Sequence, residues 1–302
     1  ILLEQNYRST QNILSAANSV ISKNESRKEK NLWSDSGSGP KLSGFVAENE
    51  HHEAEFVRDE LFKLSKEGTS KFGETAIFYR TNAQSRVFEE VFMRSAVPYK
   101  VVGGVRFYER KEIKDLLAYL RVLVNPNDEV SLRRIINTPK RGIGDRALDA
   151  IDDVAKRDSI SFWSALATSN STELSPRANA SIQAFVSMLV ALRVLVEANR
   201  PPSTIAAAIL EQSGLLEELR ASHDPQDEVR VENLEELVAV IEEYEERAIS
   251  EGETPTLGAF LEEVSLVADA DEIPEGDDHG GVVTLMTLHT AKGLEFPTVF
   301  LS

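Results

Sequence analysis

Three short segments of this sequence combine residue types that could bind a base or a phosphate group. The first, residues 5–10 (QNYRST), places Tyr7 next to Arg8 at the start of a predicted helix. An aromatic ring can stack on a base, and a guanidinium group can reach an anionic oxygen. The same pair can also be a packing contact at a helix start, so this segment alone decides nothing.

The second segment, residues 79–86 (YRTNAQSR), directly follows the apolar run Thr75–Tyr79, which is short enough for a buried strand. Open α/β sheets bind their ligands beyond the carboxyl ends of their strands. Arg80 and Asn82 are therefore candidate ligand contacts. Thr81 or Asn82 could instead be only the cap of the helix that follows.

The third segment, residues 284–296 (TLMTLHTAKGLEF), leaves a predicted strand, makes a polar turn and returns toward another strand. The turn contains Thr287, His289, Gly293 and Glu295. A single His is more often structural and a Lys-Gly pair is common, but the whole combination after a strand is not. We therefore treat these four residues as candidate site residues.

A fourth feature is a basic, glycine-containing loop at residues 138–144 (TPKRGIG). Its candidate contacts are Thr138, Lys140, Arg141, Gly142 and Gly144. Glycines let the backbone approach a ligand closely, and free amides at the start of the next helix attract phosphate. The sequence thus predicts a phosphate-binding loop, and the alternative is an ordinary turn between two helices.

The elements that must position these segments divide the chain in two. Residues 1–101 alternate helical and strand patterns, residues 106–270 show helices without a convincing strand, and strands resume near residue 281. This order predicts an α/β fold with a parallel, doubly wound sheet, interrupted by an inserted all-helical domain. The expected strands are 42–46, 75–79, 99–102, 282–286 and 298–301; the expected helices are 12–22, 51–65, 84–95, 111–124, 181–198 and 231–247; and residues 269–280 are an acidic linker.

The net charge of −17 argues against a nucleic-acid partner until its distribution is considered. Residues 221–280 hold 20 Asp and Glu against two Arg, so the rest of the chain is about neutral. Residues 79–146 carry 14 basic and 8 acidic residues, a net of +6. A phosphate backbone responds to this local field, so DNA binding stays compatible with the composition.

The sequence contains no cysteine, which excludes disulfides, thiolate nucleophiles and Cys-ligated metals and fits a reducing compartment. Apolar runs such as residues 185–195 are broken well short of a membrane span, and no signal peptide opens the chain. We therefore expect a cytoplasmic protein without membrane contact, and no metal site within this chain.

Together, segments 5–10, 79–86 and 284–296 resemble motifs IV, IVa and V of superfamily 1 DNA helicases, most closely the UvrD, PcrA and Rep type. The order and spacing of the segments match across the whole chain. The resemblance implies a RecA-like motor domain (2A) in residues 1–102 and 279–302, and a helical accessory domain (2B) in residues 103–278. It also implies an ATP-driven 3′-to-5′ translocase that separates DNA strands in repair or replication.

The resemblance further assigns roles to the candidate residues. Tyr7 would stack on adenine, and Arg8 would contact the γ-phosphate as a catalytic arginine finger. Gly293 and Glu295 would lie beside the nucleotide. The channel for single-stranded DNA would be lined by Arg80, Asn82, Thr287 and His289. Duplex DNA would meet the loop that contains Thr138, Lys140, Arg141, Gly142 and Gly144.

Parts of an ATP site are missing from the sequence. There is no G-x-x-x-x-G-K-[ST] phosphate loop and no Asp-Glu pair after an apolar strand, and the sequence ends before the family's motif VI. ATP and Mg²⁺ would thus be bound by a longer parent protein that supplies the N-terminal motor domain. The chain alone is expected to bind single-stranded and duplex DNA without hydrolysing ATP.

Two other interpretations stay open. The chain could be a non-catalytic DNA- or protein-binding module, which would contact repair or replication proteins. It could also belong to a RecB- or AddA-like helicase subunit, although no Asp/Glu/Lys nuclease constellation is visible in the sequence.

Overall fold

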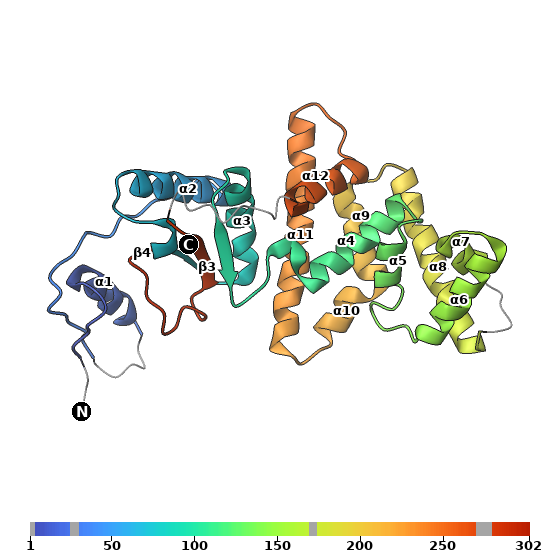
Figure 1. Ribbon diagram of the computed structural model, residues 1–302, viewed down its shortest axis with the longest axis horizontal. Coiled ribbons are helices and arrows are strands. Elements are labelled where there is room, and N and C mark those ends of the chain that lie inside the picture. The colour runs from blue at the N-terminus through green and yellow to red at the C-terminus, as the bar shows by residue number, and fades with distance from the viewer. Residues whose placement is uncertain (1–3, 25–29, 169–173, 270–279) are drawn as a thin grey trace.

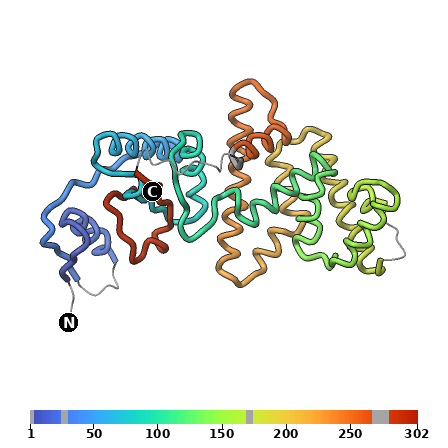
Figure 2. The backbone as a smooth tube through the Cα atoms, in the orientation of Figure 1, coloured from blue at the N-terminus to red at the C-terminus, as the bar shows by residue number. Residues whose placement is uncertain are grey.

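The computed structural model describes residues 4–24, 30–168, 174–269 and 280–302, and these form two parts (Figure 1). We call the part built on the β-sheet the sheet domain and the part built from α4 to α12 the helical domain. Figure 2 shows the chain passing from the first to the second through residues 103–110. The expected acidic linker lies almost entirely outside the described residues, as does the expected domain boundary at residues 278 and 279.

The sheet contains β1 (Thr75–Tyr79), β2 (Tyr99–Val102), β3 (Val283–Thr287) and β4 (Thr298–Leu301) in the order β2-β3-β1-β4. Every pairing is parallel, as predicted. Parallel sheets are usually buried on both faces, which explains why β1 and β3 read as compact apolar runs. Three of the expected strands match these bounds, and the fourth is displaced by one residue.

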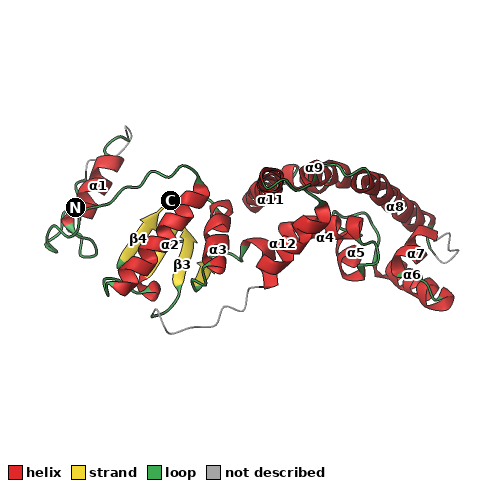
Figure 3. Ribbon diagram, turned by 90° about the horizontal axis from the view of Figure 1, so that it is seen from above, coloured by secondary structure: helices red, strands yellow, loops and turns green. Residues whose placement is uncertain are grey.

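Helices α2 (Glu50–Lys66) and α3 (Ser85–Arg94) lie side by side against the sheet (Figure 3). The Asn49 side chain caps α2 by accepting a hydrogen bond from the His52 amide at 2.8 Å. The shared core of the two helices and the strands contains Val57, Leu61, Phe88, Phe92, Ile77 and Leu285. This core holds β1 and β3 in place against the two helices, and thereby positions the loops that follow the two strands.

The segment before the sheet contains α1 (Gln11–Ile21), which lies apart from the strands in Figure 1. Its backbone is tied to a following loop, because the Gln11 amide donates to the Gly37 carbonyl at 2.9 Å. The strand expected at residues 42–46 is wrong. Val46 is 93% exposed, and the Phe45 ring stacks on Phe56 with centroids 3.9 Å apart, so this apolar run packs one ring on α2 instead of pairing with a strand.

The helical domain surrounds α4, whose stripe of Ile113, Leu116 and Leu120 is fully buried. Helices α5, α8, α9, α11 and α12 all contact α4. Within described residues 103–269 there is no strand, which agrees with the predicted all-helical insertion. The bounds are α4 (Lys111–Val124), α5 (Glu129–Ile135), α6 (Asp145–Asp158), α7 (Phe162–Thr168), α8 (Pro176–Glu197), α9 (Pro202–Ser213), α10 (Leu215–Arg220), α11 (Pro225–Ser250) and α12 (Leu257–Asp269).

Helix α8 is longer and more continuous than the sequence reading allowed. Its 22 residues are enough, by length and composition alone, to cross a membrane. The earlier start follows from Pro176 at the first helical turn and from Ser175, whose hydroxyl accepts from the Ala178 amide at 3.2 Å. One face, with Ile182, Phe185 and Leu189, belongs to the core that α8 shares with α4, α7 and α9. This face of α8 therefore packs within the helical domain, and 28% of its most apolar 18-residue window is buried.

Candidate nucleotide and DNA site

The carboxyl ends of β1 and β3 bring two of the candidate segments together. Tyr79 and Thr287 are register partners, and the Leu288 amide donates to the Tyr79 carbonyl at 2.9 Å. The residues after these strands therefore leave the sheet at one edge. This edge carries the candidate contacts to single-stranded DNA, which are Arg80, Asn82, Thr287 and His289. Of these, Arg80 and His289 are exposed.

The loop after β1 is shaped by its own side chains. The Gln84 side-chain oxygen accepts from the amides of Arg80 and Thr81, each at 2.9 Å. A short 3-10 turn, Asn82–Gln84, follows and leads into α3. The Gln84 side chain thus fixes the backbone of this loop. The Arg80 side chain is exposed and is available to an anion.

The turn after β3 is held by two threonines and pressed against the end of β2. The hydroxyls of Thr287 and Thr290 lie 2.9 Å apart, and the Thr290 amide donates to the Thr287 hydroxyl at 3.2 Å. Gly103 has a φ of +83°, and a Cβ there would lie 2.8 Å from the Thr290 side chain. A glycine is thus required at position 103, just after β2, because the Thr290 side chain occupies the space that a Cβ would need. Thr290 in turn closes the turn that carries His289.

Tyr7, Arg8 and Glu295 form a second, separate group. The Arg8 Nε atom donates to the Glu295 carboxylate at 2.7 Å, across 287 residues of sequence. The Asn6 side chain accepts from the amides of Arg8 and Ser9 at 2.9 and 2.8 Å, which sets the turn that presents Arg8. The Tyr7 ring is 82% exposed. The structure thus brings together two residues that the sequence placed at opposite ends of the chain.

Gly293 lies in the same loop as Glu295 and has a φ of +93°, with no atom within 4 Å of a Cβ built at this position. The surface beside it is therefore open, and a flat group could approach the backbone closely. Among the described residues, no group of three or more His, Asp or Glu side chains could hold a metal ion. The described residues thus offer a base-stacking ring and a cation, but no carboxylate cage.

The basic loop between α5 and α6 differs from the expectation at Arg141 and at Thr138. Lys140, Gly142 and Gly144 are exposed, and the amides of residues 142–146 have no acceptor within the described part of the chain. The Arg141 guanidinium instead turns inward. It donates to the Pro139 carbonyl at 3.2 Å, to the Ser213 carbonyl at 3.0 Å and to the Tyr119 hydroxyl at 2.7 Å. Arg141 therefore shapes the loop and is not free to contact a phosphate.

Thr138 is likewise engaged within the protein, because its hydroxyl donates to the Arg134 carbonyl at 3.0 Å and its carbonyl accepts from Tyr119. Other cations of the basic stretch are also paired. Arg134 contacts Asp115 at 2.7 Å, and Arg133 contacts both Glu129 and Asp152. The net charge of residues 79–146 thus overstates the number of cations that are available to DNA.

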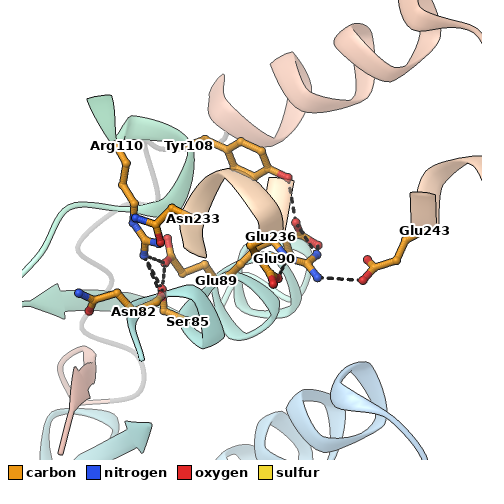
Figure 4. Close-up of polar contacts among 10 residues, drawn as sticks. Asn82, Ser85, Glu89, Glu90, Tyr108, Arg110, Asn233, Glu236 and Glu243 are labelled. Atoms are coloured by element: carbon orange, nitrogen blue, oxygen red, sulfur yellow. Dashed lines mark hydrogen bonds and ion pairs between the residues drawn. The ribbon is translucent and has the colours of Figure 1, made fainter. Parts of the chain in front are cut away.

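The sequence reading missed a buried polar cluster where α3 meets α11 (Figure 4). Arg86 is 2% exposed and donates to Glu236 at 2.7 Å, to Glu243 at 3.0 Å and to Glu90 at 3.3 Å. Burial acts to lower the pKa of Arg86, but the carboxylates of Glu90, Glu243 and Glu236 outweigh it and raise the pKa. This Arg86 cluster joins the sheet domain to the helical domain.

A second buried group lies beside it. Glu89 is 3% exposed; it accepts from the Ser85 hydroxyl at 2.6 Å and from the Phe107 amide at 3.0 Å. Burial raises the pKa of Glu89, against the opposing effects of Ser85, Phe107 and Arg110. The signal in the sequence was the adjacent pair Glu89 and Glu90 within the otherwise largely apolar run 87–93.

Comparison with known proteins gives the family. The UvrD-like helicase C-terminal domain family matches residues 1–302, the whole chain. The chain belongs to this family. The predicted resemblance to UvrD- and PcrA-type proteins is thereby confirmed at the level of the family.

Relatives of this UvrD-like chain are similar along its entire length. It is 54% identical to a Mycobacterium tuberculosis protein named ATP-dependent DNA helicase UvrD1, with 100% of the chain and 40% of that relative covered. It is 47% identical to a Staphylococcus epidermidis protein and 41% identical to a Bacillus subtilis protein, both named ATP-dependent DNA helicase PcrA, with the same coverage. The chain thus spans about 40% of the length of these relatives.

Proposed function

We propose that this chain is the second motor domain and the helical accessory domain of an ATP-dependent 3′-to-5′ DNA helicase that acts in DNA repair or replication. The observation that carries the proposal is the Arg8–Glu295 pair at 2.7 Å, which unites the candidate nucleotide contacts from both ends of the chain. The relatives named above are ATP-dependent DNA helicases, and this supports the same class. The proposed domains are residues 1–102 with 279–302, and residues 103–278.

In the proposed mechanism, ATP bound with Mg²⁺ supplies the free energy through cleavage of its terminal phosphate. The exposed Tyr7 ring would stack on the adenine, and the open backbone at Gly293 would leave room beside it. Arg8 would exchange its carboxylate partner for the terminal phosphate and stabilise the charge that develops there. An exposed ion pair contributes about 0–1 kcal/mol, so Arg8 can leave Glu295 readily.

The contacts to single-stranded DNA would lie at the sheet edge where β1 and β3 end. Arg80 would neutralise a phosphate of the single strand, while Asn82, Thr287 and His289 would offer polar contacts along the same path. The Leu288–Tyr79 backbone bond ties the two loops together, so a displacement of one loop moves the other. Glu295 lies in the loop between β3 and β4. A nucleotide-dependent movement near Glu295 would therefore be passed on to the residues that contact single-stranded DNA.

The isolated chain is expected to show no DNA-stimulated ATP hydrolysis. Catalysis needs a cradle of backbone amides and a lysine around the phosphates, and the sequence contains no such phosphate loop. Phosphate release should be measured at saturating single-stranded DNA, with a version extended by the N-terminal motor domain as the positive control. DNA-dependent turnover that stays with the chain through repurification would contradict the proposed division of the ATP site.

We also propose that the α5–α6 loop binds duplex DNA without sequence preference, since amides and lysines read phosphates and not base edges. The unpaired amides of residues 142–146 point to the same kind of ligand as the exposed Lys140 and Arg146. The Arg141 guanidinium stabilises this loop from its inner side by donating hydrogen bonds to carbonyls of the loop, including that of Pro139. A protein-contact role for the helical domain is the alternative if the next experiment finds no contribution of this loop to DNA binding.

For duplex DNA, the slope of log K against log[salt] is expected to be about −2 to −4, for two to four neutralised phosphates at about −0.9 each. Lys140→Ala with Arg146→Ala should flatten this slope by about two. Lys156→Ala with Arg157→Ala is the matched control, because it removes two exposed charges from the other end of α6. Affinity should be measured at several salt concentrations. Equal slopes for both double variants would make the loop a plain helix–helix turn.

The remaining parts of the proposal concern partners and location. The chain would act with the N-terminal motor domain, single-stranded and duplex DNA, and repair or replication proteins. Its relatives are bacterial DNA helicases, and we propose a cytoplasmic location for this chain.

A further inference from the structure

Arg110 lies buried where the chain enters the helical domain, immediately before α4. The residue is 6% exposed and lies between the loop after β1, helix α3 and helix α11 (Figure 4). Its contacts link the candidate single-strand site to the helical domain.

The guanidinium reaches three separate structures. Nη2 donates to the Asn82 carbonyl at 3.0 Å and to the Ser85 hydroxyl at 2.9 Å, both in the sheet domain. Nη1 donates to the Asn233 side chain on α11 at 2.8 Å. A planar fork with five donors can hold such divergent acceptors in fixed directions, which a single ammonium group cannot.

The Asn82 carbonyl accepts from the Ser85 amide within the 3-10 turn and, from outside the turn, from Arg110 at 3.0 Å. The Ser85 hydroxyl lies 2.9 Å from that carbonyl, but it also lies 2.6 Å from a Glu89 carboxylate oxygen. The hydroxyl has one proton, and the shorter bond to a charged acceptor is the stronger one. Arg110 is then the side chain that ties the carbonyl of a candidate DNA-contacting residue to a group outside its own loop.

The contact on the helical domain is equally well defined. Asn233 is 3% exposed, and its Nδ2 atom donates to the Glu112 carboxylate at 2.6 Å. This bond fixes the amide orientation, so its oxygen must face the Arg110 guanidinium. Glu112 belongs to α4, so this part of the cluster lies wholly within the helical domain.

We propose that Arg110 is a positioning residue that fixes the strand-binding loop at Asn82 relative to the helical domain. A single strand at this loop and a duplex at the α5–α6 loop are then held in one geometry and bind as one continuous ligand. This inference rests on the proposed function, because it requires both DNA contacts. It concerns a coupling between the two contacts and not either contact alone.

The test compares wild type with Arg110→Lys, Asn233→Leu and Glu112→Gln. Arg110→Lys retains a charge near Glu89 but loses the fork, and Asn233→Leu removes the contact on α11 together with the bond from Asn233 to Glu112. Glu112→Gln is the matched control, since it alters the same buried cluster without touching the sheet domain. Thermal unfolding of each variant measures its effect on stability separately from any effect on coupling.

The first readout is the affinity for a duplex with a 3′ single-stranded tail, compared with blunt duplex and with single strand. We expect wild type to prefer the tailed duplex by about 5- to 150-fold, the usual range for coupled sites. Arg110→Lys and Asn233→Leu should lose this preference, whereas Asn233→Leu should bind the two separate DNAs within about twofold of wild type. Glu112→Gln should retain the preference.

The second readout is the distance between the two domains. The chain has no cysteine, so spin labels can be placed at Lys66→Cys on α2 and Ser187→Cys on α8 without background. The distance distribution should broaden in Arg110→Lys and Asn233→Leu and stay narrow in Glu112→Gln. A purely structural role would lower the melting temperature without broadening this distribution.

The outcomes separate the two proposals. An unchanged tail preference and an unchanged distance distribution in both variants would overturn the role of Arg110 and leave the proposed function standing. A wild-type protein that binds both DNAs but shows no preference for the tailed duplex would have the same meaning. A wild-type protein that binds none of these DNAs would overturn the proposed function, and this inference with it.

Discussion

Arg8→Ala is expected to lower kcat for ATP hydrolysis by about 10³- to 10⁵-fold in the full-length helicase that we propose, the range seen for arginine fingers. The alanine cannot stabilise the charge that develops on the transferred phosphoryl group. Arg8 is half exposed and bonded to Glu295 at 2.7 Å, so its removal breaks no buried contact. Single-turnover and steady-state hydrolysis should be measured at saturating DNA and ATP.

Two variants sharpen this test. Glu295→Gln removes the charge that competes for Arg8 but leaves the arginine in place, so kcat should fall far less than in Arg8→Ala. Arg8→Lys retains the charge without the planar fork and should behave more like the alanine variant. DNA affinity should change little in all three. A kcat for Arg8→Ala within a few-fold of wild type would instead make Arg8 a packing residue at the start of α1.

The edge of the sheet could be predicted from the sequence because its signals are local. A five-residue apolar run followed by Arg80 and Asn82 can only present those side chains beyond the end of a buried strand. The same holds for β3 and the turn with Thr287 and His289. Parallel strands end at a common edge, so two correct strands were enough to bring the two segments together.

Arg141 shows where that reasoning fails. The residue types and spacing of the α5–α6 loop predicted a cationic surface, but they carry no information about side-chain direction. One acceptor of Arg141 is the Ser213 carbonyl, 72 residues further along the chain. Only the packing of α9 against the loop places an acceptor there, and buried carbonyls without a donor are unfavourable. The guanidinium is therefore drawn inward.

The strand expected at residues 42–46 failed for a related reason. An apolar run becomes a strand only if a sheet edge is available to pair with it. Here β4 and β2 form the two edges, and residues 42–46 pair with neither. Phe45 stacks on Phe56 of α2 instead and stays 42% exposed, without pairing to a strand.

The junction between the domains was also outside the reach of the sequence. Arg86 belongs both to the polar segment 79–86 and to the expected helix 84–95, and its partners Glu236 and Glu243 lie 150 and 157 residues away. These two glutamates belong to the acidic segment at residues 221–280, whose composition does not show which of its side chains are buried. Seven residues apart, they project from one side of α11, and that side meets α3.

Arg86→Met is expected to lower the free energy of unfolding by about 3–5 kcal/mol, the usual effect of removing one partner of a buried ion pair. Glu90 is 6% exposed and would lose its cation while keeping only the Tyr108 hydroxyl, which donates to it at 2.9 Å. Glu236 and Glu243 are partly exposed and can turn to water, which favours the lower end of that range. Urea unfolding followed by circular dichroism measures the change.

Arg94→Met is the matched control, because Arg94 lies on the same helix and also faces the helical domain. Its guanidinium is 54% exposed and lies 3.5 Å from Glu263, so its loss should change the free energy of unfolding by about 1 kcal/mol or less. Glu90→Gln added to Arg86→Met should recover part of the loss, since it removes the unpaired charge. Equal effects of Arg86→Met and Arg94→Met would mean that the Arg86 cluster is hydrated, and that the two domains are held together mainly by apolar contacts.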